Sequence, residues 1–98
     1  MTFSVGVIAL KSVITVMGKD GVGIIARLSA LLAKNSVNII DITQTTSENQ
    51  FFMVMVVDMG KATASFSDIA AELQSLGEML EQKIQVRHKK VYDSMHRI

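Results

Sequence analysis

A glycine-rich segment is the first place where this chain could do chemistry. Three of the six residues in Gly18-Lys19-Asp20-Gly21-Val22-Gly23 are glycines. Glycine at this density is typical of a tight turn, or of a loop that brings backbone close to a ligand. The segment leads straight into a predicted helix, whose N-terminus carries unpaired N–H groups and a partial positive charge. That combination suits a carboxylate or a phosphate.

The glycine-rich loop does not match the two common nucleotide-binding patterns. No Gly-Lys-Ser/Thr sequence closes it, and the spacing of its glycines differs from that of a dinucleotide fingerprint. Two interpretations stay open: a tight strand-to-helix turn without a ligand, and a cradle for a small anionic group.

Two polar residues interrupt an apolar segment further along, Asn38 and Asp41. One has an even and the other an odd residue number, and side chains alternate along a strand. The two are therefore predicted to face opposite sides of a strand, unless one of them stands at its start. One interpretation is that they line a site beside the glycine loop and offer donors and acceptors to a small polar ligand. The other is that Asn38 ends a loop and Asp41 faces water.

The hydrophobic pattern predicts the elements that must position these residues. Strands are predicted over residues 11–17, 37–46, 51–58 and 83–88, which are β-branched or alternate in polarity. One helix is predicted from Ile24 to a left-handed stop at Asn35, and another from a cap near Ser65 to Leu80. Gly77 is expected to weaken the last turn of the second helix.

The order β-α-β-β-α-β predicts an α+β, ferredoxin-like fold, with a four-stranded antiparallel sheet and both helices on one face. The short polar link at residues 47–50 favours a hairpin between the middle strands. A length of 98 residues suits one domain. We assign residues 11–98 to it, with a short extra C-terminal helix, and residues 1–10 to an N-terminal extension.

Both faces of the third predicted strand are apolar. Alternate residues share a face, so Phe51, Met53, Met55 and Val57 are predicted on one side and Phe52, Val54 and Val56 on the other. Two helices on one face leave the second face to be covered by the apolar N-terminal segment, the C-terminal tail or a second subunit. The apolar content of 49% in so small a chain favours an oligomer, most simply a homodimer.

Composition argues against several other functions. The net charge of +1 and the lack of Lys or Arg in the third strand argue against nucleic acid. The chain has no cysteine, and spacing places no nucleophile or acid near His88 or His96. The loop's only cation is Lys19, where an acylphosphatase of this fold would need Arg. We expect a cytoplasmic, non-catalytic protein without a signal peptide, cofactor, metal or membrane contact.

Two segments together resemble a known family, the ACT domain. They are Gly18-Lys19-Asp20-Gly21-Val22-Gly23-Ile24-Ile25 and Asn38-Ile39-Ile40-Asp41-Ile42-Thr43-Gln44. That family has an Asp, a glycine and an aliphatic residue at the first turn, and an Asn-Ile pair opening the second strand. The resemblance runs from about Lys11 to Arg87. It is strongest to small stand-alone ACT proteins and extends to the ACT repeats of the glycine-cleavage-system transcriptional regulator.

The resemblance implies a regulatory module that binds an amino acid or a similar small molecule. ACT domains commonly pair side by side into an eight-stranded sheet, with ligand between the loop of one subunit and the second strand of its neighbour. By position, the ligand-binding residues are Asp20, Gly21, Val22, Gly23, Ile24, Asn38, Ile39 and Ile40. The family's usual proline before the loop glycine is absent here. The alternative is an interaction or oligomerisation module without a small-molecule ligand, acting on a regulated protein partner.

Overall fold

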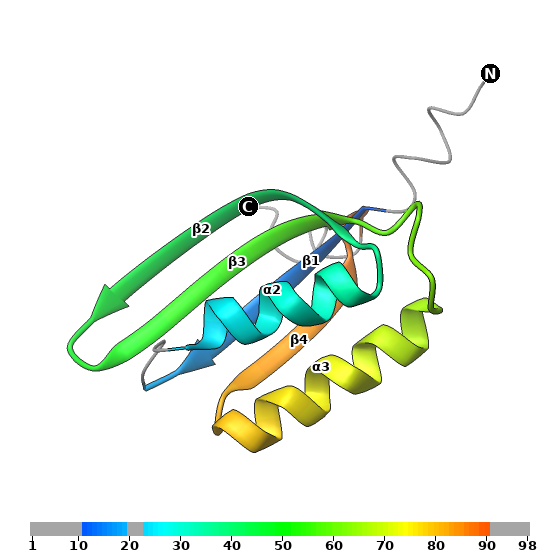
Figure 1. Ribbon diagram of the computed structural model, residues 1–98. Coiled ribbons are helices and arrows are strands. Elements are labelled where there is room, and N and C mark those ends of the chain that lie inside the picture. The colour runs from blue at the N-terminus through cyan, green and yellow to red at the C-terminus, as the bar shows by residue number, and fades with distance from the viewer. Residues whose placement is uncertain (1–10, 20–22, 91–98) are drawn as a thin grey trace.

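The computed structural model describes residues 11–19 and 23–90, which form one sheet and two helices (Figure 1). In chain order the elements are β1 (Lys11–Gly18), α2 (Ile24–Lys34), β2 (Asn38–Ser47), β3 (Gln50–Asp58), α3 (Phe66–Leu80) and β4 (Lys83–His88). The predicted β-α-β-β-α-β order is confirmed. The N-terminal extension at residues 1–10 and residues 91–98 of the predicted C-terminal helix lie outside the described residues.

The sheet has the strand order β2-β3-β1-β4, and every neighbouring pair is antiparallel. Both helices lie on the same face, and β2 and β4 form its two edges (Figure 1). The predicted ferredoxin-like fold is therefore confirmed. Neither described helix is long and apolar enough to cross a membrane.

The core fills the space between the helices and the sheet. The helices cover one of the two faces into which the alternation divides β3, and all four residues of that face are buried; they are Phe51, Met53, Met55 and Val57. The helices contribute buried side chains at helical spacing, namely Ile24, Leu28, Leu32, Ile69 and Leu73. The other face is here called the open face, because Phe52 of β3 is 40% exposed and Met17 of β1 is 46% exposed there, although Val13 of β1 on the same face is buried.

The helix α2 ends one residue before Asn35, which confirms the position of the predicted stop. The predicted left-handed backbone at Asn35 is wrong, because Asn35 has a φ of −96° and the next residue, Ser36, has a φ of 58°. The N–H of Val37 donates to the carbonyl of Leu32 at 2.9 Å, which is the bond of a Schellman turn. In that turn the left-handed position follows the cap, so it falls on Ser36.

The helix α3 begins as predicted and runs on through Gly77. The Ser65 hydroxyl accepts the N–H of Asp68 at 3.1 Å, which caps the first turn. Gly77 does not end the helix early, since α3 continues to Leu80. A Cβ at Gly77 would stand 2.6 Å from the carbonyl oxygen of Gln82, so glycine allows the chain to turn back closely into β4.

Candidate functional site

The two ends of the sheet hold different halves of the candidate residues. We call the end where β1 stops at Gly18 the loop end, and the end where β1 starts at Lys11 the far end. Gly18 pairs with Phe51 and Lys11 pairs with Asp58, so β3 runs from the loop end to the far end. The antiparallel order puts the β1–α2 loop, the β2–β3 turn and the α3–β4 turn together at the loop end.

Gly23 and Ile24 are the described residues of the predicted binding loop. Gly23 has a φ of 78°, in the left-handed region that favours glycine, and it precedes α2. Its carbonyl accepts the N–H of Arg27 at 3.1 Å. Ile24 is buried in the core and therefore anchors the loop. The remaining loop residues of the prediction, Asp20, Gly21 and Val22, lie outside the described residues.

The start of α2 is suited to an anionic group. No side-chain hydrogen bond caps this end at Gly23, and the first turn has no acidic residue. The first N–H groups of a helix have no partner within the helix and carry a partial positive charge. A ligand carboxylate placed there would take the position that a capping side chain occupies at the start of α3.

A pocket of about 440 Å³ opens at the loop end. Three connections supply its walls, and the lining residues are Gly18, Lys19, Ile24, Gln50, Leu80, Glu81 and Gln82. Lys19 and Glu81 are exposed and carry opposite charges. Volumes of a few hundred cubic ångströms are usual for small-molecule sites. The opposite charges suit a molecule that carries both an anionic and a cationic group.

Sequence reasoning missed the pocket residues that come from the other two connections. Gln50 starts β3 directly after the β2–β3 turn, and Glu81 and Gln82 belong to the α3–β4 turn. No local motif marks them. The predicted strand order did contain a usable signal, because alternate turns of an antiparallel sheet must fall at the same end.

Asn38, Ile39 and Ile40 lie at the far end, away from the loop. Asn38 pairs with Asp58, whereas the loop follows Gly18, which pairs with Phe51. Seven steps along β3 separate these pairs, or about 23 Å at the usual rise per residue. The interpretation that Asn38 and Asp41 line a site beside the glycine loop is therefore wrong within a single chain.

A β-bulge changes the orientation of these two polar residues. The register shifts between Ile39 and Asp41, so Ile40 is the inserted residue. Asn38 then pairs with Asp58 and Asp41 with Val56, two positions on the open face. The prediction that Asn38 and Asp41 face opposite sides is wrong for this reason, while the alternative that one of them starts the strand is correct for Asn38.

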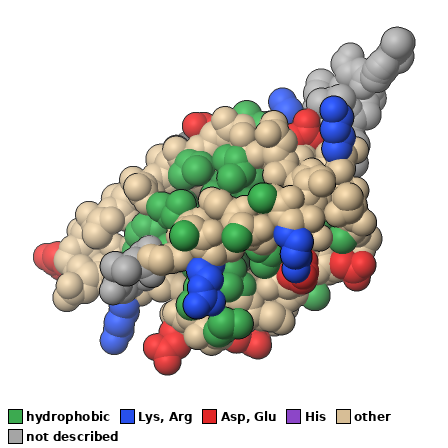
Figure 2. All heavy atoms as spheres, viewed as in Figure 1, with side chains coloured by type: hydrophobic (Ala, Val, Ile, Leu, Met, Phe, Trp, Pro, Cys, Tyr) green, Lys and Arg blue, Asp and Glu red, His purple; other side chains and the backbone are tan. Residues whose placement is uncertain are grey.

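The edge strand β2 is exposed along almost its whole length. Only Ile39 is half-buried, while Ile40 is 47% exposed and Ile42 is 40% exposed. Figure 2 shows hydrophobic side chains gathered beside α2, over β2 and β3. Edge strands are usually protected by lysine, proline or several charges, and Asp41 is the one charged residue of β2. This edge is therefore open to pairing with another strand.

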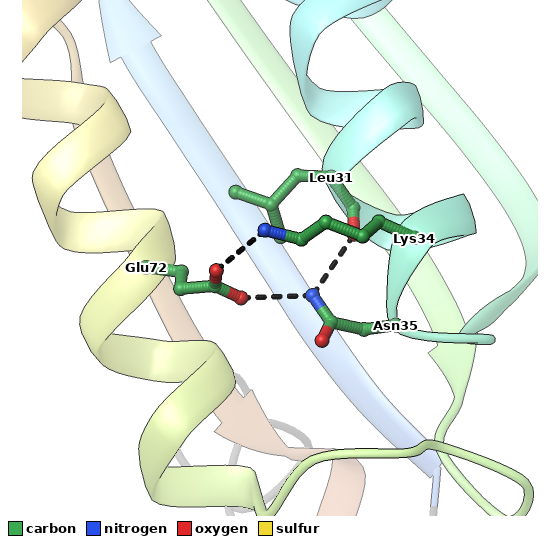
Figure 3. A network of polar contacts seen from close by, with 4 residues as sticks. All are labelled: Leu31, Lys34, Asn35 and Glu72. Carbon is green, nitrogen blue, oxygen red and sulfur yellow. Dashed lines mark hydrogen bonds and ion pairs between the residues drawn. The ribbon is translucent and has the colours of Figure 1, made fainter.

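A polar network fixes the far end, where α2 leads into β2 (Figure 3). The Asn35 Nδ2 donates to Glu72 Oε1 at 2.8 Å and to the Leu31 carbonyl at 3.0 Å. The Lys34 ammonium pairs with Glu72 Oε2 at 2.8 Å. Hydrogen bonds from Lys34 and then Asn35 hold the pKa of the Glu72 carboxyl below its ordinary value. The network ties the end of α2 to α3 and sets where β2 begins.

His88 serves a packing contact at the far end. Its ring stacks on Phe66 with a centroid separation of 4.2 Å and an interplanar angle of 18°. Within residues 11–19 and 23–90, no three His, Asp or Glu side chains are grouped as metal ligands would be. His96 lies outside the described residues.

Comparison with known proteins identifies the family. Residues 12–87 match the ACT domain family. A UPF0237 protein of Methanococcus maripaludis is 45% identical over 86 residues, which covers 88% of this chain and 96% of that relative. An ACT domain protein from Streptococcus pneumoniae has a similar structure, with a TM-score of 0.74 at 34% identity, over 87% of this chain and 96% of that chain.

A more distant structure shows the same fold. A protein assigned as a glycine cleavage system transcriptional repressor matches with a TM-score of 0.69 at 15% identity, over 79% of this chain and 45% of that chain. The family match spans the described sheet and both helices. This chain therefore belongs to the ACT domain family.

Proposed function

We propose that this chain is a non-catalytic regulatory module that binds an amino acid, or a molecule of similar size and charge, at a homodimer interface. One observation carries the proposal: the candidate residues are divided between the two ends of a sheet whose edge strand β2 is open. In a dimer, the candidate residues at one end of the sheet can lie next to those at the other end of the second copy's sheet. The regulatory role is supported by the repressor that shares this fold.

Antiparallel pairing of β2 with the β2 of a second copy supplies the missing half of the site. Asn38 starts β2 at the far end, and Ser47 ends it at the loop end. A twofold-related partner strand runs in the opposite direction. Asn38 of the partner subunit then lies at the loop end, where Gly23 and the pocket are. This arrangement agrees with the one that the family resemblance implies.

The ligand chemistry follows from the groups at the loop end. The N–H groups at the start of α2, behind Gly23, hold a carboxylate. The Glu81 carboxylate pairs with the ligand's ammonium group, and the Lys19 ammonium adds a full positive charge near the ligand's carboxylate. The amide of Asn38 of the partner subunit donates to or accepts from the side chain of the ligand.

The dimer is tested by mass, using light scattering after size exclusion. Ile42→Lys puts a charge on each of the two paired edges, and we expect it to give a monomer. The matched control is Ala71→Lys, an exposed position on α3, which should remain a dimer. A wild-type monomer, or a dimer that persists in Ile42→Lys, would contradict pairing through β2.

The ligand is tested by a thermal-shift screen of the twenty amino acids. A ligand at one hundred times its dissociation constant stabilises the fold by about 2.7 kcal/mol. For a domain of this size the melting temperature should rise on the order of 10 °C. Gly23→Val and Asn38→Ala should abolish the shift, and Gly60→Val, in an exposed loop at the far end, should keep it. A flat screen with an intact dimer would favour the interaction module without a small-molecule ligand.

A further inference from the structure

A second cavity lies at the far end, away from the loop-end pocket. It has a volume of about 190 Å³, and it lies between β1, β4 and the segment that joins β3 to α3. Its lining residues are Ser12, Met59, Ala62, Ala64, Phe66 and His88. None of them is Lys, Arg, Asp or Glu, so the cavity has no permanently charged group with which to hold an ion. The lining suits a neutral occupant.

Ser12 is an unusual residue for its position in the sheet. It pairs with Val57 on the face that the helices cover, where β1 otherwise places Ile14 and Val16. Ser12 is 0% exposed. Its hydroxyl donates to the Met59 sulfur at 3.8 Å, and a thioether is a weak acceptor. A buried hydroxyl with so weak a partner is costly, and an oxygen acceptor in the cavity would remove that cost.

The walls of the cavity are already in place. The stacked rings of His88 and Phe66 both line the cavity. The joining segment is held by three hydrogen bonds: Gly60 N–H to Asp58 Oδ1 at 2.8 Å, Ala62 N–H to the Met59 carbonyl at 3.1 Å, and Thr63 N–H to the Asn35 carbonyl at 2.9 Å. A site with preformed walls loses little conformational freedom when it is filled.

We propose that this cavity binds a small, neutral, mostly apolar molecule that carries one carbonyl or hydroxyl oxygen. The apolar body packs against Met59, Ala62 and Ala64, and the oxygen accepts a hydrogen bond from the Ser12 hydroxyl. An engineered apolar cavity of about 150 Å³ in another protein binds benzene, so a ring or branched chain of roughly six heavy atoms fits here.

The test uses NMR of the full chain labelled with ¹³C at the methionine methyl groups, with cyclopentanone as the probe. Met59 lines the cavity, and we expect its methyl signal to shift and to saturate as the probe is added. Met17 and Met79 are exposed elsewhere and should not shift. A Met59 signal that does not move, or that moves only together with those of Met17 and Met79, overturns the proposal.

Two variants distinguish the contribution of the Ser12 hydrogen bond from that of the cavity volume. Ser12→Ala should weaken cyclopentanone binding by several-fold, up to about tenfold, and remove its advantage over cyclopentane, which lacks the oxygen. Ala64→Leu should fill the cavity and abolish the response of Met59. Ala71→Leu, at an exposed position on α3, should preserve it. If Ser12→Ala keeps the preference for cyclopentanone, the assignment of Ser12 as the donor is wrong.

Discussion

The loop end and the far end of the sheet are built in different ways. At the far end, α2 is tied to α3 by Asn35, Lys34 and Glu72, and the carbonyl of Asn35 also accepts the N–H of Thr63. At the loop end, α2 starts at Gly23 without a side-chain cap, beside an open pocket. The far end therefore fixes where β2 starts, while the loop end leaves backbone groups available to a ligand.

Under the proposed function, neither end is a complete site by itself. The loop end has the pocket, and the far end has the polar residue that opens β2. Because the two ends are about 23 Å apart along β3, a single chain cannot join them. In the proposed dimer, a second copy paired with the exposed edge strand β2 joins them.

The largest expected effect is at the loop end, at the return from α3 into β4. Gly77→Ala would place a Cβ 2.6 Å from the Gln82 carbonyl oxygen and 3.2 Å from Ile84 Cγ1. We expect unfolding free energy to fall by about 2 to 3 kcal/mol, because backbone must move to relieve the contact. Urea denaturation of the wild type and the variant measures this change in unfolding free energy. An unchanged midpoint would show that Gly77 is not required for this close approach.

A smaller loss is expected from the far end. Asn35→Ala removes the two hydrogen bonds that its buried side chain donates to Leu31 and Glu72. Unfolding free energy should fall by about 2 kcal/mol. Lys34→Ala removes only the more exposed half of the network and should cost less than about 1 kcal/mol. Equal losses for the two variants would mean that the buried amide does not dominate this end.

The two left-handed residues at the ends of α2 should respond in opposite directions. Gly23→Ala forces a side chain onto a φ of 78°, and this backbone strain should lower the unfolding free energy by about 1 kcal/mol. A steric clash should not add to the loss, because no atom beyond the neighbouring residues lies within 4 Å of the new Cβ. Ser36→Gly relieves a φ of 58° and should gain up to about 1 kcal/mol. Thermal or urea unfolding of both variants checks this. Changes of the same sign would contradict the backbone explanation.

The smallest expected effect is the response of the far end to acid. The pKa of Glu72 is lowered in the fold, so its contribution is present above the ordinary value of 4.5 and is lost as the pH falls through the depressed value. Unfolding of the wild type and of Glu72→Gln, measured from neutral pH downwards, should therefore differ less as the pH falls. A constant difference over that range would show that the ion pair does not contribute.

The strongest predictions from sequence concern local patterns. The alternation of β3 correctly grouped its four buried residues on one face, without showing which face the helices cover, and Ser65 was correctly placed at the start of α3. The stop of α2 was placed correctly at Asn35, but its left-handed residue was not, because Schellman geometry puts that residue one position later, at Ser36. Strand alternation and helix capping depend on residues that are only a few positions apart, so a short segment of the sequence is enough to predict them.

The candidate site was only partly predictable, because it depends on residues that are far apart in the chain. The glycine loop was visible as a motif, and its described residues do begin α2 beside a pocket. The other walls, with Gln50 and Glu81, come from turns far away in the chain. The bulge at Ile40 was invisible too, because a single inserted residue in an apolar run leaves no mark on the pattern.

Residue types and their short-range spacing were enough to predict the element order, the family and the apolar faces of the helices and of β3, because each of these depends on neighbouring residues in the chain. The tertiary structure was needed to show that the bulge at Ile40 brings Asn38 and Asp41 to the same face of the sheet, and that Gly77 must lack a side chain. Both depend on strand register and on the close return of distant backbone. Those are properties of how segments pack together, and no single segment contains them.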